Sequence, residues 1–299
     1  MLRAPPAGGE IHGGRFVLLD LAQGMPLRLR YIARRLMPTL RHALFTALLC
    51  LSLHAAAAPA SVYLQELSTT QVRDALREGR RTLIVPVGGT EQNGPHMALG
   101  KHNFRVHALA GRIAAELGNA LVAPVVAYVP EGRISPPTEH MRYAGTISIP
   151  ESTFRGLLDG VARSMAQHGF TDIVFIGDSG NTQGTLKLVA AALNRDWKAA
   201  AARAHYIAAY YDAAQAPFVQ KLHERGLSNA QIGSHAGAAD TSLMLAVDAS
   251  KVWPDKASAQ AAGVSGDATR ASAELGRLGT ELIVQKSVAA IRQATAAPR

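Results

Sequence analysis

The stretch that decides the fold runs from Leu83 to Asn103. It reads Leu83-Ile-Val-Pro-Val87, then Gly88-Gly89, then Thr90-Glu-Gln-Asn-Gly-Pro-His-Met-Ala-Leu-Gly-Lys-His-Asn103. The apolar part is typical of a buried strand, and the two glycines end it. The loop beyond carries one carboxylate, Glu91, and two imidazoles, His96 and His102. Ligands bind at the ends of buried strands in α/β proteins, so the loop is a candidate metal site. Taken alone, the stretch also fits a surface turn with solvated histidines.

Strands and helices alternate along the chain beyond this stretch. The alternation predicts an α/β fold, a three-layer sandwich whose mostly parallel central sheet is covered by helices on both faces. We find no linker or internal repeat, so we expect one domain at residues 61–299. The predicted strands are 83–87, 120–126, 172–176 and 205–210, and the predicted helices are 104–117, 154–165, 186–193 and 268–291.

Residues 1–60 are interpreted as an N-terminal extension followed by a secretory signal at about 37–60. Arg41-His42 precede an apolar run, Ala43 to Leu53, and small residues follow it up to Ala60. This order is typical of a cleavable signal, and the run is shorter than the roughly twenty residues that span a bilayer. We therefore expect a periplasmic or secreted mature protein without a stable membrane anchor. Met25 and Met37 are alternative starts to Met1.

Charge and cysteine content narrow the function classes. The formal net charge is +9, but residues 1–60 hold seven Arg against two acidic residues, which leaves 24 basic and 20 acidic side chains beyond them. No basic stripe interleaved with aromatics occurs, so nucleic acid is not expected as a partner. The single cysteine, Cys50, lies inside the signal, so the mature chain is expected to contain no disulfide.

Two further loops carry polar residues where predicted strands or helices begin or end. Asp178, Ser179 and Asn181 follow the third strand, whereas His235 and Asp240 open a helix. A buried Asp after a strand is costly unless it is paired, hydrogen-bonded or metal-bound. Taken alone, Asp178 also fits a residue that caps a loop, and His235 also fits a cap at the start of a helix. Because strand ends meet at one sheet edge, we expect these loops to converge with the Glu91 loop.

Four segments in order resemble the creatininase family. The family's Gly-x-Thr-Glu-Gln-His-Gly-Pro-His-Leu-Pro-Leu-x-Thr-Asp is similar to residues 88–102, and its His-x-x-Phe-Pro-Gly-Thr-Ile-Ser-Leu to His140-Met-Arg-Tyr-Ala-Gly-Thr-Ile-Ser-Ile149. Its Asn-Gly-His-Gly-Gly-Asn corresponds to residues 176–181. Its His-Ala-Gly-Glu-x-Glu-Thr-Ser corresponds to His235-Ala-Gly-Ala-Ala-Asp-Thr-Ser242.

The resemblance implies a divalent-metal amidohydrolase, yet the departures fall on the metal ligands. Glu91 matches the family's glutamate. Asn93 stands where the family motif has a histidine, and His102 stands where it has an aspartate. Asp178 stands where the family has a later histidine, and Gly180 where it has a further carboxylate. Because one His and one Asp have exchanged loops, we expect a retained ion on Glu91, His102 and Asp178. Zn, Mn or Fe suits that set. We expect one ion per subunit, with two as the alternative, and a hexameric homo-oligomer by resemblance.

The remaining site residues are given roles by the same resemblance. His235 is the candidate for proton transfer and His96 a second catalytic candidate, with a loop-stabilising hydrogen bond as the alternative for His96. The predicted substrate-binding residues are Asn93, His140, Ser179, Asn181 and Asp240. The predicted function is hydrolysis of a small cyclic or linear amide at a non-peptide C–N bond. The alternatives are a periplasmic small-molecule-binding protein without turnover, and a hydrolase of a ring C–C or lactone bond.

Overall fold

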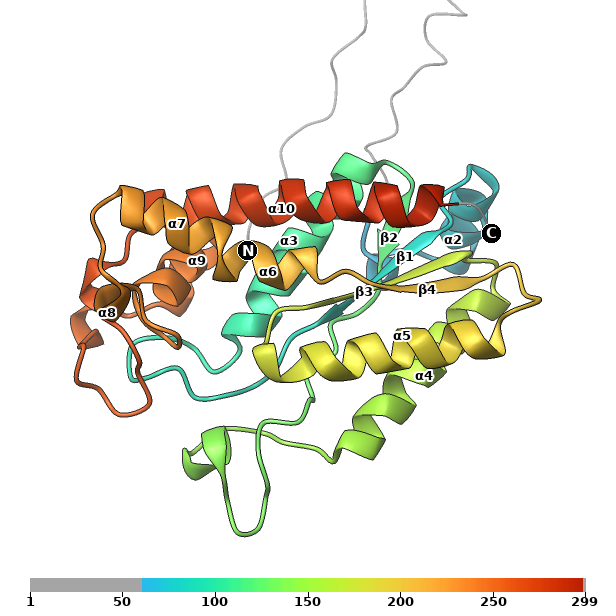
Figure 1. The fold of residues 1–299 in the computed structure, drawn as a ribbon. Helices are drawn as coiled ribbons and strands as arrows, with labels where there is room; N and C mark the ends of the chain where they lie inside the picture. Colours follow the sequence, from blue (N-terminus) through green and yellow to red (C-terminus); the bar gives the residue numbers. More distant parts are fainter. Residues whose placement is uncertain (1–60, 298–299) are drawn as a thin grey trace, which may run out of the picture. The chain divides into compact units, whose positions relative to one another are not determined.

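The structure, a computed structural model, describes residues 61–297 (Figure 1). The predicted signal and extension therefore lie outside the described residues. The described part forms one compact unit around a four-stranded parallel sheet in the order β2-β1-β3-β4. The strands are β1 (Thr82–Val87), β2 (Ala120–Val122), β3 (Asp172–Gly177) and β4 (Arg203–Tyr206).

Helices cover both faces of this sheet, which confirms the predicted fold class (Figure 1). Their bounds are α2 (Thr69–Arg77), α3 (Lys101–Leu117), α4 (Glu151–Gln167), α5 (Gln183–Asp196), α6 (Ala209–Gln215), α7 (Pro217–Glu224), α8 (Asn229–Ile232), α9 (Ala238–Asp248) and α10 (Ala273–Ala296). Side chains on alternate positions of each strand point to opposite faces, so the sheet separates two apolar cores.

The two cores follow that alternation. Ile84, Val174 and Ile176 face a core shared with α3, α6, α7, α9 and α10. Leu83, Val85 and Phe175 face the other core, which α4 and α5 complete. All six of these strand side chains are 0% exposed. Burial on both faces explains why β1 and β3 read as continuous apolar runs rather than as alternating ones.

Two predicted strands end earlier than the sequence indicated. β2 stops at Val122, and Pro124 cannot donate to a ladder, so only an isolated bridge joins Val126 to Val87. The strand predicted at 205–210 is β4, Arg203–Tyr206, and Tyr210 already lies in α6. Ile207 and Tyr210 are buried in the core, and a short apolar run does not distinguish strand from helix.

The surface between β2 and α4 carries exposed apolar side chains. This segment projects away from the sheet at the bottom of Figure 1. More than a third of each of four apolar side chains on it is exposed: Tyr128, Ile134, Tyr143 and Ile147.

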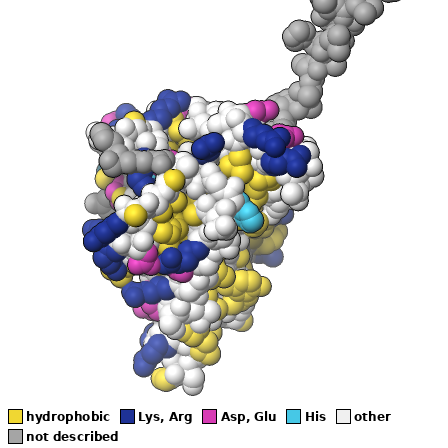
Figure 2. Space-filling model, turned by 90° about the vertical axis from the view of Figure 1, so that its right-hand side faces the viewer, with side chains coloured by type: hydrophobic (Ala, Val, Ile, Leu, Met, Phe, Trp, Pro, Cys, Tyr) yellow, Lys and Arg dark blue, Asp and Glu magenta, His cyan; other side chains and the backbone are white. Residues whose placement is uncertain are grey.

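On the face drawn in Figure 2, Lys and Arg side chains stand in separate groups with uncharged surface between them. Within residues 61–297, no helix is both long enough and apolar enough to cross a bilayer. Homo-oligomer formation stays a prediction.

Candidate active site

The chemistry-bearing loops meet where the strand order reverses. β1 lies between β2 and β3, so the chain leaves the ends of β1 and β3 toward opposite sides and opens a crevice between them. Glu91 lies in the loop after β1, and Asp178 directly follows β3. Both side chains are buried, at 2% and 7% exposed. The predicted convergence of the two loops at one sheet edge is therefore present in the structure.

Glycines allow α3 to begin against the end of β1. A Cβ on Gly88 would lie 2.1 Å from Oδ1 of Asn103, which is too close for any side chain. The same Oδ1 accepts a hydrogen bond from the backbone N–H of Gly89 at 2.9 Å. This contact holds the first turn of α3 beside the strand end, so Lys101, His102 and Arg105 enter the crevice from one helix.

His102 bridges the two predicted carboxylate ligands. Its Nε2 lies 2.9 Å from Oε1 of Glu91, and its Nδ1 lies 2.5 Å from Oδ1 of Asp178. Burial opposes the charged imidazole, yet the adjacent carboxylates raise the pKa of His102 above its usual value. Asp178 is further held by the Tyr210 hydroxyl, which donates to Oδ2 at 2.9 Å. Glu91, His102 and Asp178 thus come together, but as a hydrogen-bonded chain in which both ring nitrogens already face a carboxylate.

Two buried cations complete this network, and the sequence-based site did not include them. The Lys101 ammonium lies 2.8 Å from Oδ2 of Asp240 and 3.4 Å from Oε1 of Glu91. Arg105 donates through Nε to Oδ1 of Asp178 at 2.9 Å and through Nη1 to Oδ1 of Asp240 at 2.6 Å. Burial alone raises carboxyl pKa values, but these cations outweigh it and hold the pKa of Asp240 well below its usual range.

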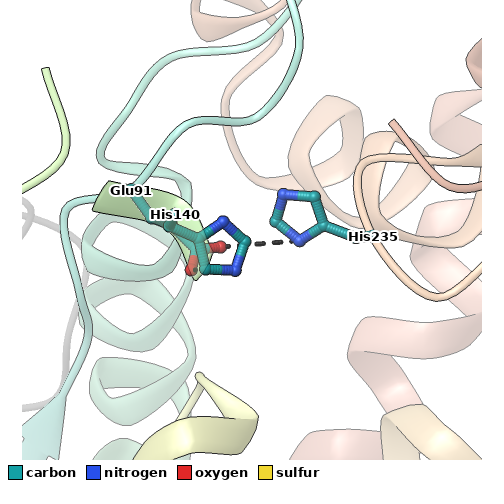
Figure 3. A group of neighbouring side chains, drawn as sticks. All are labelled: Glu91, His140 and His235. Carbon is teal, nitrogen blue, oxygen red and sulfur yellow. Dashed lines mark ion pairs between the residues drawn. The ribbon is translucent and has the colours of Figure 1, made fainter. Parts of the chain in front are cut away.

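A second group of ligand types lies at the open side of the same crevice. Glu91, His140 and His235 each offer a ligand atom, and these atoms lie within 4.8 Å of one another. Figure 3 shows His235 approaching from the side opposite to Glu91 and His140. Nε2 of His140 lies 3.3 Å from Oε2 of Glu91, and Nδ1 of His235 lies 3.7 Å from Oε1. Among residues 61–297, this is the group that meets the geometry for holding a metal ion.

Gln92 orients both imidazoles of this group. Nε2 of His235 lies 2.9 Å from the backbone carbonyl of Gln92, to which it donates. The Gln92 amide nitrogen is 3.3 Å from Nδ1 of His140. Burial and the charge of Lys101 lower the pKa of His235 to about 4. His235 is therefore neutral near pH 7, and its Nδ1 lone pair lies 3.4 Å from the Lys101 ammonium and 3.7 Å from Oε1 of Glu91. A neutral imidazole whose other nitrogen donates to a carbonyl is the form that binds a metal ion.

A cavity of about 260 Å³ lies over these residues. Its lining includes Glu91, His102, Asp178 and His235, together with the predicted substrate-binding residues His140, Ser179, Asn181 and Asp240. A space of this size accommodates a small molecule. Asn93 and His96 are not among the lining residues; both are 0% exposed.

Asn93 and His96 hold the loop in shape. The Asn93 amide donates to the backbone carbonyls of Glu91 and Ala98 at 2.9 and 3.0 Å. Nε2 of His96 lies 3.0 Å from the Thr241 hydroxyl. The contacts of His96 match the loop-stabilising alternative. The substrate-binding role of Asn93 and the catalytic role of His96 stay predictions.

Glu131 is a buried carboxyl next to Glu91 that the sequence reasoning missed. It is 0% exposed, its Oε2 accepts a hydrogen bond from the amide of Asn181 at 3.1 Å, and its Oε1 has no hydrogen-bond partner among residues 61–297. Burial and the negative charge of Glu91 raise the pKa of Glu131 to about 8. The available signal was a lone carboxylate soon after the second predicted strand.

Comparison with known proteins assigns the family. The family model "Creatininase: Creatinine amidohydrolase" matches residues 65–291. The chain belongs to the creatininase family. A creatinine amidohydrolase of Pseudomonas putida is 30% identical over 262 residues, which cover 78% of this chain and 97% of that protein. A shorter match, 37% identical, links 36% of this chain to 43% of a mycofactocin precursor peptide peptidase of Mycolicibacterium smegmatis. The chain is a hydrolase of a family that acts on C–N amide bonds.

Solved creatininase structures share the fold. A manganese creatininase superposes with a TM-score of 0.67 at 26% identity, covering 79% of this chain and 100% of that one. Two structures of a variant creatininase, each at 25% identity and a TM-score of 0.67, are described as a Zn-Zn type and as complexed with creatine. Creatininase-family relatives therefore bind Mn or Zn and a small molecule.

The donor set of this chain fits such a metal. One carboxylate and two imidazoles, Glu91, His140 and His235, are the ligand types of catalytic zinc sites. The Gln92 carbonyl bound to Nε2 of His235 supplies the second contact that metal-binding histidines require. The assignment of His102 and Asp178 as ligands stays a prediction.

Proposed function

We propose that this protein hydrolyses a non-peptide C–N amide bond in a small polar molecule, cyclic or linear. The observation that carries the proposal is the Glu91, His140 and His235 group at the strand-order reversal of a creatininase fold. The cavity of about 260 Å³ favours a small substrate over a folded peptide segment. The family relationship supports the amide bond as the target.

Glu91, His140 and His235 would hold one divalent ion, Zn or Mn by analogy with the relatives. When bound, the ion supplies Lewis-acid polarisation of a carbonyl and lowers the pKa of water. The rest of the chemistry falls to the protein. Gln92 keeps the two rings in orientation through its amide and its carbonyl. Asp178, fixed by Arg105 and Tyr210, keeps His102 against Glu91.

Glu131 is the group that retains a proton near neutral pH. It is 0% exposed and is not among the residues that line the cavity: its Oε1 lies against Gly89, and its Oε2 accepts a hydrogen bond from Asn181. Because its Oε1 is buried and has no opening to the cavity, Glu131 cannot reach a substrate atom and is proposed to act only through its charge state beside Glu91. The proton-transfer role that the sequence analysis gave to His235, which does line the cavity, stays a prediction.

Hydrolysis is tested with a panel of small lactams, cyclic ureides, linear amides and lactones. The purified protein is loaded separately with Zn²⁺ and Mn²⁺, and amine or carboxylate release is followed. We expect turnover of at least one amide when either ion is loaded. Binding of an amide without hydrolysis under either ion would favour the binding-protein alternative. Turnover confined to lactones would favour the other bond class.

We further propose that the mature protein is exported. The basic, apolar and small-residue order of residues 41–60 supports this, and it lies outside the described residues. N-terminal sequencing of the mature protein from its native host should begin near Pro59 or Ser61. Full-length chain in the cytoplasm would contradict export.

A further inference from the structure

Lys101 is the most completely buried charged side chain beside the proposed metal group. It is the first residue of α3 and is 1% exposed. Its ammonium lies 3.4 Å from Oε1 of Glu91 and 3.4 Å from Nδ1 of His235. These are two of the three residues in the metal-holding group. A positive charge therefore already lies against the atoms that would bind an ion.

Buried carboxylates keep this ammonium in place. Asp240 binds Nζ at 2.8 Å, and the same carboxylate accepts a hydrogen bond from the backbone of Ala236 at 2.8 Å. One helical turn after Lys101, Arg105 pairs with both Asp178 and Asp240. Glu91, Asp178 and Asp240 therefore each have a protein cation as a partner. A cluster that supplies its own cations has less excess negative charge to attract a second metal ion.

An ion bound to Glu91 would lie close to the Lys101 ammonium. An ion bound to Oε1 of Glu91 at about 2.2 Å cannot lie farther than about 5.6 Å from Nζ, because Nζ is 3.4 Å from that oxygen. Like charges at this separation in a buried site repel strongly. We propose that Lys101, with Arg105 beside it, takes the place of one metal ion. The chain then holds at most one divalent ion, in competition with the Lys101 ammonium.

The inference is tested by metal binding, independently of turnover. Zn²⁺ affinity at fixed pH is measured by competition with a chromogenic chelator for the wild type and for Lys101→Met, a neutral side chain of similar length. We expect Lys101→Met to bind the first Zn²⁺ at least tenfold more tightly. Lys101→Arg keeps the cation and should stay within about threefold of the wild type. Lys286→Met, an exposed lysine on α10, is the matched control and should not change affinity.

The number of zinc ions bound per wild-type chain is a second test. It needs no variant, so it still applies if Lys101→Met does not fold. After equilibration with excess Zn²⁺ and gel filtration, elemental analysis should give no more than one zinc per chain. Two ions per chain would overturn the proposal, as would equal Zn²⁺ affinity in wild type and a folded Lys101→Met. If no amide is hydrolysed but Lys101→Met still binds Zn²⁺ more tightly than the wild type, the proposed function is wrong and this inference holds.

Discussion

Glu91→Ala should lose metal and turnover together. Glu91 contacts three other side chains of the site: Oε1 lies 2.9 Å from Nε2 of His102 and 3.4 Å from Nζ of Lys101, and Oε2 lies 3.3 Å from Nε2 of His140. Its removal deletes the only carboxylate of the metal-holding group and leaves the Lys101 ammonium 3.4 Å from Nδ1 of His235, where its charge repels an ion. We expect amide hydrolysis to fall by about 10³-fold or more, at the upper end of single-group effects.

The measurement pairs elemental analysis of bound zinc with initial rates on the best amide of the panel. Glu116→Ala is the matched control, because Glu116 lies on α3 but is exposed. It should keep both metal and rate. A Glu91→Ala protein that retains zinc and more than a tenth of the wild-type rate would contradict the assigned role.

Arg105→Met should destabilise the fold by about 3–5 kcal/mol, the usual result of removing one partner from a buried ion network. Arg105 is 4% exposed and is the cation shared by Asp178 and Asp240. Methionine fills similar space but leaves both carboxylates without this partner. The free energy of unfolding is measured by urea denaturation near neutral pH, where both carboxyl groups are charged because their pKa values are lowered.

Arg112→Met controls for the loss of an arginine on the same helix. Arg112 pairs with Glu281 at the surface, with side chains 42% and 56% exposed. Exposed pairs contribute about 0–1 kcal/mol, so this variant should stay close to the wild type. Equal losses in the two variants would indicate that the buried network adds no special stability.

The fold was largely predictable because its strands are buried on both faces. Leu83 to Val87 and Ile173 to Ile176 contain no polar residue, which is typical of central parallel strands. Gly118 adopts the left-handed conformation, with φ of 78°, at the predicted end of α3. The prediction failed where apolar residues continue past a strand end, as at Tyr210, because burial alone does not distinguish strand from helix.

The location of the candidate site was predictable from the sequence, but the hydrogen bonds and ion pairs between its side chains were not. Strand ends indicated which loops converge, so Glu91, Asp178 and His235 could be named together. Which nitrogen faces which carboxylate depends on tertiary packing that spacing does not encode. Lys101 and Arg105 have the spacing of one helical turn, yet charged residues at a helix start usually face solvent, so nothing in the pattern indicated burial.

The central claim is that a single ion binds Glu91, His140 and His235 beside Lys101. Anomalous diffraction at the zinc absorption edge, from crystals grown with Zn²⁺, tests it most directly. The account predicts one peak at about 2.0–2.2 Å from a carboxylate oxygen of Glu91 and a ring nitrogen of each histidine. A peak on His102 and Asp178, or two peaks in one chain, would contradict it.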